Sequence, residues 1–477
     1  VAVLYTHFHY VAGTQAVLDA FPDQKIKIYG HEKIAYNRVR TATEIAPAYS
    51  RGLVEQFAIT LPTEGKDGNV NVGLGRFYRN PEHKTQTNGF IAPTETFNSA
   101  CTLKVAGLEI DVMPAPSDAD DSVTYWFKSL GCAVNNLVWP VLFNVFAIRG
   151  EEYRDPRILL TGIDHLLSLS AKHLVGAHGM PISGEQEICE RVTKYRDSIQ
   201  FLWDQTVRLT NRGYTSVELA HSIRLPEFYD DDNLTSEFYG VTEHHVRQIR
   251  SGLLGWFDGD EANLFPLPRI EHSDRMIAGF GGREKVRQQT RDAIDNDDLR
   301  WACELSSWLV NSTDVENSDK MLLSSVLRLI AQRTTAANIR NWCLARARHL
   351  DETFDLTRFN RHRVSKKQVI ASPVGNSLSA LRVLLIPERA TRVETHIAFN
   401  FSGHKMSGLH IRNCVAVPTN GVGAEIAVNC TPEIWADIIS GDLKLSVAVE
   451  TNALTVTGDK YRALEALQVF DVENLQL

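Results

Sequence analysis

The sequence is poor in cysteine and has no long apolar run. Its seven cysteines are scattered along 477 residues, and none forms a C-x-x-C pair. Neither a disulfide framework nor a cysteine-based metal site is therefore indicated, and we expect reduced thiols, which favours the cytoplasm. Because no stretch of about 18 apolar residues occurs, the sequence predicts no membrane-spanning helix.

An excess of positive charge is also lacking. Lys and Arg number 50 against 58 Asp and Glu, so the net charge is -8, which argues against a general nucleic-acid binder. The chain opens on Val1 and an apolar run, without methionine or a signal peptide, and we expect it to be N-terminally truncated. With 43% hydrophobic residues it has ample material for about two to four domains.

The periodicity of apolar residues changes twice along the chain. Residues 1–185 read as α/β, with expected strands at 25–31, 102–112 (a hairpin turning near Gly107), 123–126, 132–134 and 174–176, and helices at 15–20 and 158–169. The segment 62–98, rich in Gly, Pro, Asn and Thr, is expected to be a long loop.

A helical period follows, and strands then return. Helices are expected at 185–211, 216–223, 243–254, 283–295, 298–311, 319–333 and 335–350. Beyond 350 the expected strands are 379–387, 393–401, 407–417, 423–429 and 443–450, with one helix around Trp435 and a last one at 460–470.

Two histidines, His7 and His9, follow the apolar run at the start of the chain. In an extended segment, side chains two residues apart project from the same face, so two imidazoles could converge on one metal ion. Histidine is the commonest metal ligand near neutral pH. The same spacing also fits histidines that are merely packed or hydrogen-bonded, so the pair alone does not decide between these interpretations.

Several further motifs accompany this pair in a fixed order. The first part contains Thr6-His7-Phe8-His9, Pro114-Ala115-Pro116-Ser117-Asp118, Asn135-Asn136, Ile148-Arg149-Gly150, Tyr153-Arg154-Asp155 and Ala177-His178-Gly179-Met180-Pro181. The helical part contains Tyr239-Gly240, Gly255-Trp256-Phe257-Asp258-Gly259 and Trp301-Ala302-Cys303-Glu304-Leu305, and the tail contains Trp435-Ala436-Asp437 and Val456-Thr457-Gly458-Asp459. With this set of motifs the chain resembles the zinc-dependent alkyl sulfatases, a branch of the metallo-β-lactamase superfamily.

The resemblance implies a fold class and an assembly. Residues 1–185 would form a partial metallo-β-lactamase αββα sandwich of the α/β class. Residues 186–350 would form an all-α dimerisation domain, and residues 351–477 an α+β domain like sterol carrier proteins. A homodimer is expected.

The resemblance also implies metal ligands. His7, His9, Asp118 and His178 match ligand positions of the family. Val11 and Ala12, however, stand where Asp and His would bind a second metal, and 133–135 contains no acid where the family has a bridging carboxylate. Because an apolar side chain cannot ligate and an amide oxygen is a weak, neutral donor, we expect one zinc ion per chain. The alternatives are no metal, or a rearranged site that uses His31, Glu32, Asp120 or Asp121.

The resemblance also implies which residues bind the substrate. Asn144, Arg149 and His244 match the residues that hold the sulfate group in the family, and arginine suits an oxyanion because its planar fork donates two hydrogen bonds. Asn135, Tyr10 and Tyr239 are additional candidates. Without the family, Arg149 would read as an ion-pair partner of Glu151, Glu152 or Asp155, His244 as a helix-surface histidine beside His245, and Asn144 as a turn residue.

The sequence thus predicts a dimeric metallo-hydrolase that cleaves small alkyl sulfate esters. A zinc ion lowers the pKa of a bound water from about 15.7 toward about 7 and so provides a nucleophile at neutral pH. A non-catalytic protein that binds alkyl or fatty ligands through its C-terminal domain is the alternative, and a hydrolase of another ester or amide is a third reading. No nucleic-acid partner is expected.

Overall fold

The computed structural model describes residues 1–75, 89–360, 362, 366–370 and 374–476. The chain forms two compact units, Val1–Ala35 with Tyr49–Arg358 and Tyr36–Ala48 with Phe359–Leu477. The first unit contains both the α/β part and the helical part, and the domain boundaries near 185 and 350 stay a prediction. All seven cysteines carry free thiols. Among the described residues, no helix combines the length and the apolarity that a bilayer crossing requires.

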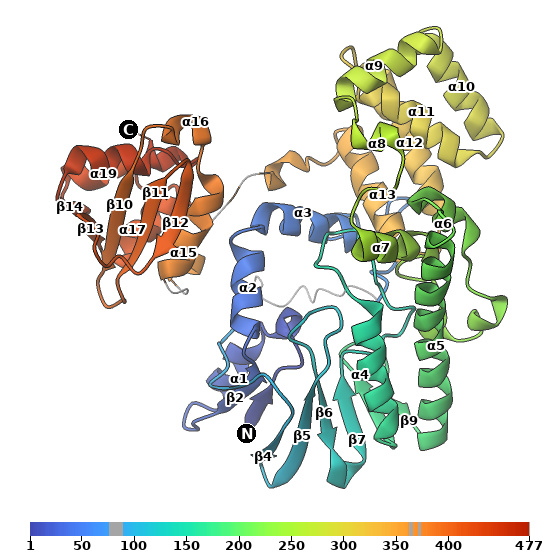
Figure 1. Ribbon diagram of the computed structural model, residues 1–477, viewed down its shortest axis with the longest axis horizontal. Helices are drawn as coiled ribbons and strands as arrows, with labels where there is room; N and C mark the ends of the chain where they lie inside the picture. The colour runs from blue at the N-terminus through green and yellow to red at the C-terminus, as the bar shows by residue number, and fades with distance from the viewer. Residues whose placement is uncertain (76–88, 361, 363–365, 371–373, 477) are drawn as a thin grey trace. The chain divides into compact units, whose positions relative to one another are not determined.

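The α/β part contains two sheets (Figure 1). A parallel sheet of order β1-β2-β3 is formed by β1 (Ala2–Leu4), β2 (Lys27–His31) and β3 (Glu95–Phe97). A six-stranded sheet follows the chain order and consists of β4 (Cys101–Val105), β5 (Leu108–Pro114), β6 (Val123–Phe127), β7 (Cys132–Asn135), β8 (His173–Gly176) and β9 (Ile182–Ser183). Its neighbouring strands are antiparallel except for β7 and β8, which are parallel.

The helices of this part are α1 (Thr14–Ala20), α4 (Pro156–Ser168), α5 (Glu185–Thr210) and the portion of α3 (Ala46–Gln56) from residue 49 on. Helix α2 (Ile34–Ala42) belongs to the second unit from residue 36 on. The side chain of Asp155 caps α4 by accepting from the backbone N of Arg157 (2.9 Å), and Pro156 occupies the first turn, where its missing N–H costs nothing. The buried residues Leu159, Ile163 and Leu166 of α4 recur every three or four positions, and α4 lies beside α5 against the sheet.

The expected loop at 62–98 is only partly borne out. Its last residues form β3, which pairs with β2, so this segment completes a sheet. The part of the prediction that concerns residues 76–88 lies outside the described residues. Helices α2 and α3 were not expected.

In the helical part of the first unit the expected helices are present, and two further helices, at 261–264 and 269–279, were not expected. It contains α6 (Ser216–Ser222), α7 (Thr242–Leu254), α8 (Glu261–Leu264), α9 (Arg269–Gly279), α10 (Arg283–Asp295), α11 (Leu299–Val310), α12 (Asn317–Arg333) and α13 (Ala337–Leu350). Leu323, Leu327 and Leu344 of α12 and α13 share a buried cluster with Ala58 and Leu61, which follow α3. The helices are thereby joined to the α/β part.

The second unit is a sheet covered by helices. Its strands, in the order β12-β11-β10-β13-β14, are β10 (Thr395–Phe401), β11 (Ser407–Arg412), β12 (Val415–Thr419), β13 (Ile426–Cys430) and β14 (Thr455–Thr457). The helices are α14 (Lys366–Ile370), α15 (Val374–Leu381), α16 (Pro387–Ala390), α17 (Pro432–Ser440), α18 (Leu445–Glu450) and α19 (Lys460–Leu467). Trp435 of α17 is fully buried against Phe399 and Phe401 of β10.

Two strand predictions in this unit are wrong, and a third is divided by a turn. Residues 379–387 lie in the end of α15 and the turns after it, and 443–450 forms α18. In both helices, residues three positions apart are buried together, Leu378 with Leu381 and Leu445 with Ala448. Packing on one helix face therefore decides the structure here, although the β-branched residues of these segments favour a strand. The expected strand 407–417 is a hairpin of β11 and β12 that turns at Asn413 and Cys414, both with positive φ.

Candidate active site

The two histidines near the start of the chain lie just beyond strand β1. The strand ends at Leu4, His7 is extended, and Phe8–Tyr10 forms a 3₁₀ turn. The prediction that both histidines sit on one face of a strand is therefore wrong in its local geometry. The turn is fixed instead by long-range bonds, because the backbone N of Phe8 donates to Asp121 (3.3 Å) and the carbonyl of Thr6 accepts from Val123 (2.9 Å).

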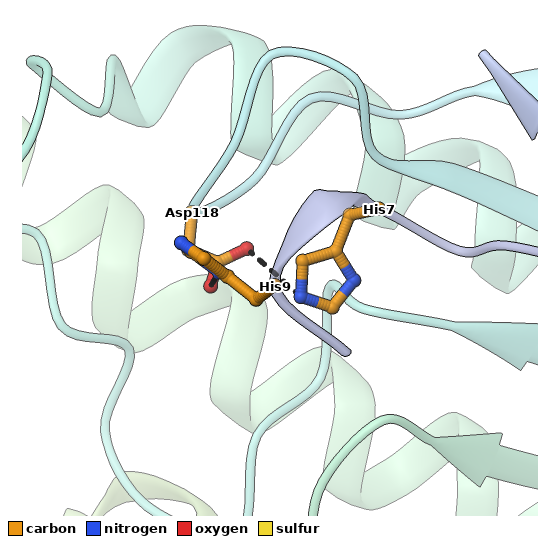
Figure 2. Close-up of side chains that lie close together, drawn as sticks. All are labelled: His7, His9 and Asp118. Carbon is orange, nitrogen blue, oxygen red and sulfur yellow. Dashed lines mark hydrogen bonds and ion pairs between the residues drawn. The ribbon is translucent and has the colours of Figure 1, made fainter. Parts of the chain in front are cut away.

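The loop between β5 and β6 brings Asp118 to both histidines. Asp118 Oδ2 lies 2.9 Å from His9 Nδ1, and Asp118 Oδ1 lies 4.0 Å from His7 Nε2 (Figure 2). One ligand atom from each residue lies within 4.8 Å of the others, a combination that no other group of three His, Cys, Asp or Glu in the described chain offers. Asn136, which follows β7, donates its amide to Asp118 and to Ser117.

Burial and the neighbouring charges together set the protonation of this cluster. Burial lowers the pKa of His7 to about 3, so its imidazole is neutral near pH 7. The pKa of Asp118 falls well below its usual range, since the two histidines outweigh the effect of burial. The pKa of His9 is raised, because Asp118 and Glu151 outweigh its burial.

The donor set fits a metal ion. The buried Nε2 atom of His7 has no hydrogen-bond partner, and leaving such an atom unpaired costs free energy unless a ligand takes it up. Two imidazoles and a carboxylate are also the ligand types of a catalytic zinc site. His7, His9 and Asp118 can therefore hold a metal.

His178 lies near this cluster without belonging to it. Its Nε2 is 3.3 Å from the hydroxyl of Tyr10, and its ring packs edge-on against Trp139, with centroids 5.0 Å apart. Burial lowers its pKa to about 4, although the charge of Asp118 opposes this shift. Tyr10 itself is exposed, so its contact with His178 is at the surface of the site.

The positions that lack ligands are filled by packing. Val11 is buried in a cluster with Tyr5, Phe8 and Ile28, and Val134 packs with the apolar residues of β5 and β6. Asn135 is fully buried, and its amide oxygen accepts from the backbone N of Leu137 (2.8 Å) and of Val138 (3.0 Å). Asn135 therefore holds the turn after β7.

The residues of the rearranged alternative have other contacts. Asp120 pairs with Lys33 (2.7 Å), Asp121 accepts from the backbone of Phe8, and Glu32 accepts from Asn98 (3.2 Å). His31 Nδ1 accepts from the backbone N of Lys33 (3.2 Å). The structure does not gather these four residues into one cluster with His7 and His9.

Arg149 forms a buried ion pair next to the cluster. Its Nη2 atom lies 2.8 Å from Glu151 Oε1, and the two side chains are 6% and 5% exposed. The same Glu151 oxygen lies 3.6 Å from His9 Nε2, so this carboxylate stands between the histidine and the arginine. Burial would raise the pKa of Glu151, but His9 and Arg149 lower it to about 2. The Nε and Nη1 atoms of Arg149 are buried without a hydrogen-bond partner.

Asn144 lies close to His245. Neither amide atom of Asn144 has a partner, and a Cβ added to Gly240 would lie 2.5 Å from its Oδ1 and 2.9 Å from His245 Nε2. His245 is fully buried and accepts from the backbone N of Phe146 through Nδ1 (3.2 Å). His244 occupies another face of α7, where its ring packs against Phe146 with centroids 5.5 Å apart.

The remaining candidate, Tyr239, belongs to the core. Its hydroxyl accepts from Gln56 (2.5 Å), its ring packs against Trp139, and burial raises its pKa to about 12. Its phenol is therefore fully protonated at neutral pH.

Sequence reasoning missed four residues of this site. Asn136 supports Asp118, Glu151 bridges His9 and Arg149, His245 lies beside Asn144, and Arg154 is a buried arginine in the segment before α4. Asn136 and Arg154 lie within the motifs that carried the resemblance, and Glu151 was considered only as an ion-pair partner. Their spatial convergence depends on loops distant in sequence.

Comparison with known proteins supports one family. The family model described as alkyl sulfatase dimerisation matches residues 215–353. A linear primary-alkylsulfatase of Pseudomonas sp. is 30% identical over 99% of this chain and 92% of its own length. An alkyl/aryl-sulfatase of Saccharomyces cerevisiae is 23% identical, over 98% of this chain and 73% of its own length.

The fold is also similar to a solved structure. The stereoselective inverting sec-alkylsulfatase Pisa1 from Pseudomonas sp. superposes with a TM-score of 0.87 at 23% identity, covering 100% of this chain and 77% of that one. This confirms the succession of an α/β part, a helical part and a C-terminal sheet unit. Since nearly the whole chain matches nearly the whole linear primary-alkylsulfatase at 30% identity, this protein belongs to the alkyl sulfatase family.

Proposed function

We propose that this protein hydrolyses alkyl sulfate esters and uses one zinc ion per chain. The observation that carries the proposal is the buried cluster of His7, His9 and Asp118, in a chain whose relatives are named as alkylsulfatases. Those names give a non-catalytic role no support. The products of the reaction are an alcohol and inorganic sulfate, with water as the second substrate.

His7, His9 and Asp118 would hold the metal, with His178 at the edge of the site. When bound, zinc supplies an acidified water at neutral pH. Asn136 keeps the carboxylate of Asp118 in place through its amide, and Glu151 faces the other nitrogen of His9 at 3.6 Å. A carboxylate behind a ligating histidine fixes the ring orientation and its tautomer, which is how such partners support metal sites.

Arg149, Asn144 and His244 would bind the sulfate group. The unpartnered, buried donors of Arg149 and Asn144 support this assignment, since an anion would satisfy them. Burial lowers the pKa of His244, so we expect it to act as a neutral hydrogen-bond donor. Asn135 and Tyr239 have structural contacts instead, and Tyr10 remains a candidate through its contact with His178.

A homodimer is part of the proposal. The matching family model is named for dimerisation, and the segment after α7 exposes large apolar side chains, including Trp256 (68% exposed) and Phe265 (80%). Apolar groups gathered on a surface in this way mark association sites. The sterol-carrier-like character of the second unit, the cytoplasmic location and the lack of a nucleic-acid partner stay predictions.

Metal content and turnover test the function together. We would measure zinc by elemental analysis and sulfate release from octyl sulfate, in wild-type protein purified without chelator and in His7→Ala/His9→Ala. The expected result is about one zinc per chain and measurable sulfate release, both lost in the double variant. Wild-type protein that binds no metal and releases no sulfate would contradict the proposal.

A further inference from the structure

Glu151 places a buried negative charge beside the arginine that is proposed to receive the sulfate group. Its Oε1 atom lies 2.8 Å from Arg149 Nη2, and its side chain is 5% exposed. The same oxygen lies 3.6 Å from His9 Nε2. An anion held by Arg149 would therefore lie next to a carboxylate of its own sign.

Arg149 is held at both ends, so we expect it to stay paired with Glu151 when an anion binds. Its backbone N donates to Gln56 Oε1 (3.2 Å). Its guanidinium carbon lies 5.7 Å from the ring centroid of Tyr49 and 5.8 Å from that of Phe57. The Nε and Nη1 atoms have no hydrogen-bond partner, so an anion can use them without displacing Glu151.

The carboxylate of Glu151 acts differently on ligands of different charge. By Coulomb's law it repels a doubly charged ligand twice as strongly as a singly charged one at the same place, and burial strengthens the effect because the effective dielectric constant is lower than in water. An alkyl sulfate carries one negative charge. The phosphate monoester of the same alcohol carries two above its second pKa, which is about 6.

We propose that Glu151 is a specificity-determining residue that disfavours phosphate monoesters relative to sulfate esters. The inference rests on the proposed function and goes beyond it, since it concerns the oxyanion that the site rejects. Both esters present tetrahedral oxyanions, so hydrogen bonds distinguish them poorly and their charge is the property that differs. A zinc ion and the two buried arginines would by themselves attract the doubly charged ester more strongly, and Glu151 opposes that preference.

A purely structural ion pair predicts a different outcome. If Glu151 only kept Arg149 in place, its replacement would weaken the binding of every anion by the same factor. The charge effect strengthens binding instead, and does so more for two charges than for one. The ratio of two affinities in one protein therefore separates the two roles, and incomplete zinc loading cancels in that ratio.

Calorimetry with three probes at pH 8 tests the inference on zinc-loaded protein. Octyl sulfonate has one charge and a carbon–sulfur bond that is not hydrolysed. Octyl phosphate has two charges at this pH, and octyl methyl phosphate has the same phosphorus centre with one charge. We would compare wild type, Glu151→Gln, Glu151→Asp and the control Glu152→Gln, which removes the same charge from the exposed neighbouring residue.

Glu151→Gln should raise the affinity for octyl phosphate relative to octyl methyl phosphate by about tenfold over the wild-type ratio. Octyl sulfonate should behave as octyl methyl phosphate does. Glu151→Asp keeps the charge and should keep the wild-type ratio. Glu152→Gln should also keep it, because water and salt screen an exposed charge.

Three results would overturn the inference: an unchanged ratio in folded Glu151→Gln, a uniform loss of affinity for all three probes, or a wild type that binds none of them. If Glu151→Gln does not fold, a crystal structure of the wild type with octyl methyl phosphate decides. Glu151 must then still pair with Arg149 beside the bound anion, and a side chain turned away refutes its role. Failure of the proposed function looks different, since octyl sulfate would release no sulfate while the shift in the ratio remained.

Discussion

Acid should destabilise the first unit through His245, whose imidazole is fully buried and accepts from the backbone of Phe146. Burial lowers its pKa from 6.5 to about 3. The unfolded chain therefore takes up a proton as the pH falls through 6.5, while the folded chain does not until about pH 3. Stability that is present above pH 6.5 is lost below it.

The size of the effect follows from the two pKa values. Between pH 7 and pH 5 the imidazole of His245 becomes protonated in the unfolded chain but stays neutral in the folded chain. This difference lowers the free energy of unfolding by about 2 kcal/mol. We would measure the free energy of unfolding by urea titration at both pH values, in wild type and in His245→Asn. The asparagine can still accept from the Phe146 backbone but cannot be protonated.

The comparison isolates this residue. His7 and His178 also have lowered pKa values, but they titrate in both proteins and their contributions cancel in the difference. We expect wild type to lose about 2 kcal/mol more than His245→Asn on going from pH 7 to pH 5. The exposed His272→Asn on α9 controls for the substitution. Parallel losses in wild type and His245→Asn would refute the assignment.

Three further predictions concern other parts of the structure. Arg149→Ala should lower turnover of octyl sulfate by well over about tenfold with zinc content unchanged, because it removes charge stabilisation and no ligand, and equal turnover would count against the anion site. Gly52→Ala should destabilise the protein and weaken octyl sulfonate binding, because an added Cβ would clash with the carbonyl oxygen of Arg149; unchanged melting and affinity would contradict this. Asp319→Ala should cost about 3 kcal/mol in urea unfolding, since its fully buried carboxylate pairs with two arginines, whereas Glu271→Ala at an exposed ion pair should cost less than about 1 kcal/mol.

The sequence predicted the helices of the first unit better than the details of its site. Helix α5 could be predicted almost to the residue, because its buried positions, such as Val192, Tyr195 and Ile199, repeat at the helical period. The structure brings the two histidines and Asp118 together, although the 3₁₀ turn at Phe8–Tyr10 depends on a bond to Asp121, more than a hundred residues away. Periodicity does not encode such a contact.

The errors in the second unit have the same origin. The segment 443–450 is rich in valine and leucine, which favours a strand, yet Leu445 and Ala448 are both buried on one side of α18. Glu151, Arg154 and His245 also escaped prediction, since a buried arginine without a carboxylate or a histidine beside a distant asparagine has no signature in a single sequence. Only the three-dimensional structure shows which residues surround these three side chains.

The charges of the site bear on how many metal ions it can hold. Arg149 and Arg154 contribute two positive charges, and Asp118 and Glu151 two negative ones, so with neutral histidines the four buried side chains sum to zero. One divalent ion and a singly charged sulfate ester would leave about one net positive charge, whereas two ions would leave about three among these buried side chains. Val134 and Val11 offer no carboxylate to offset that charge, since both are engaged in apolar packing. One ion is therefore what these side chains can neutralise, and a zinc content of about two per chain would refute this reasoning.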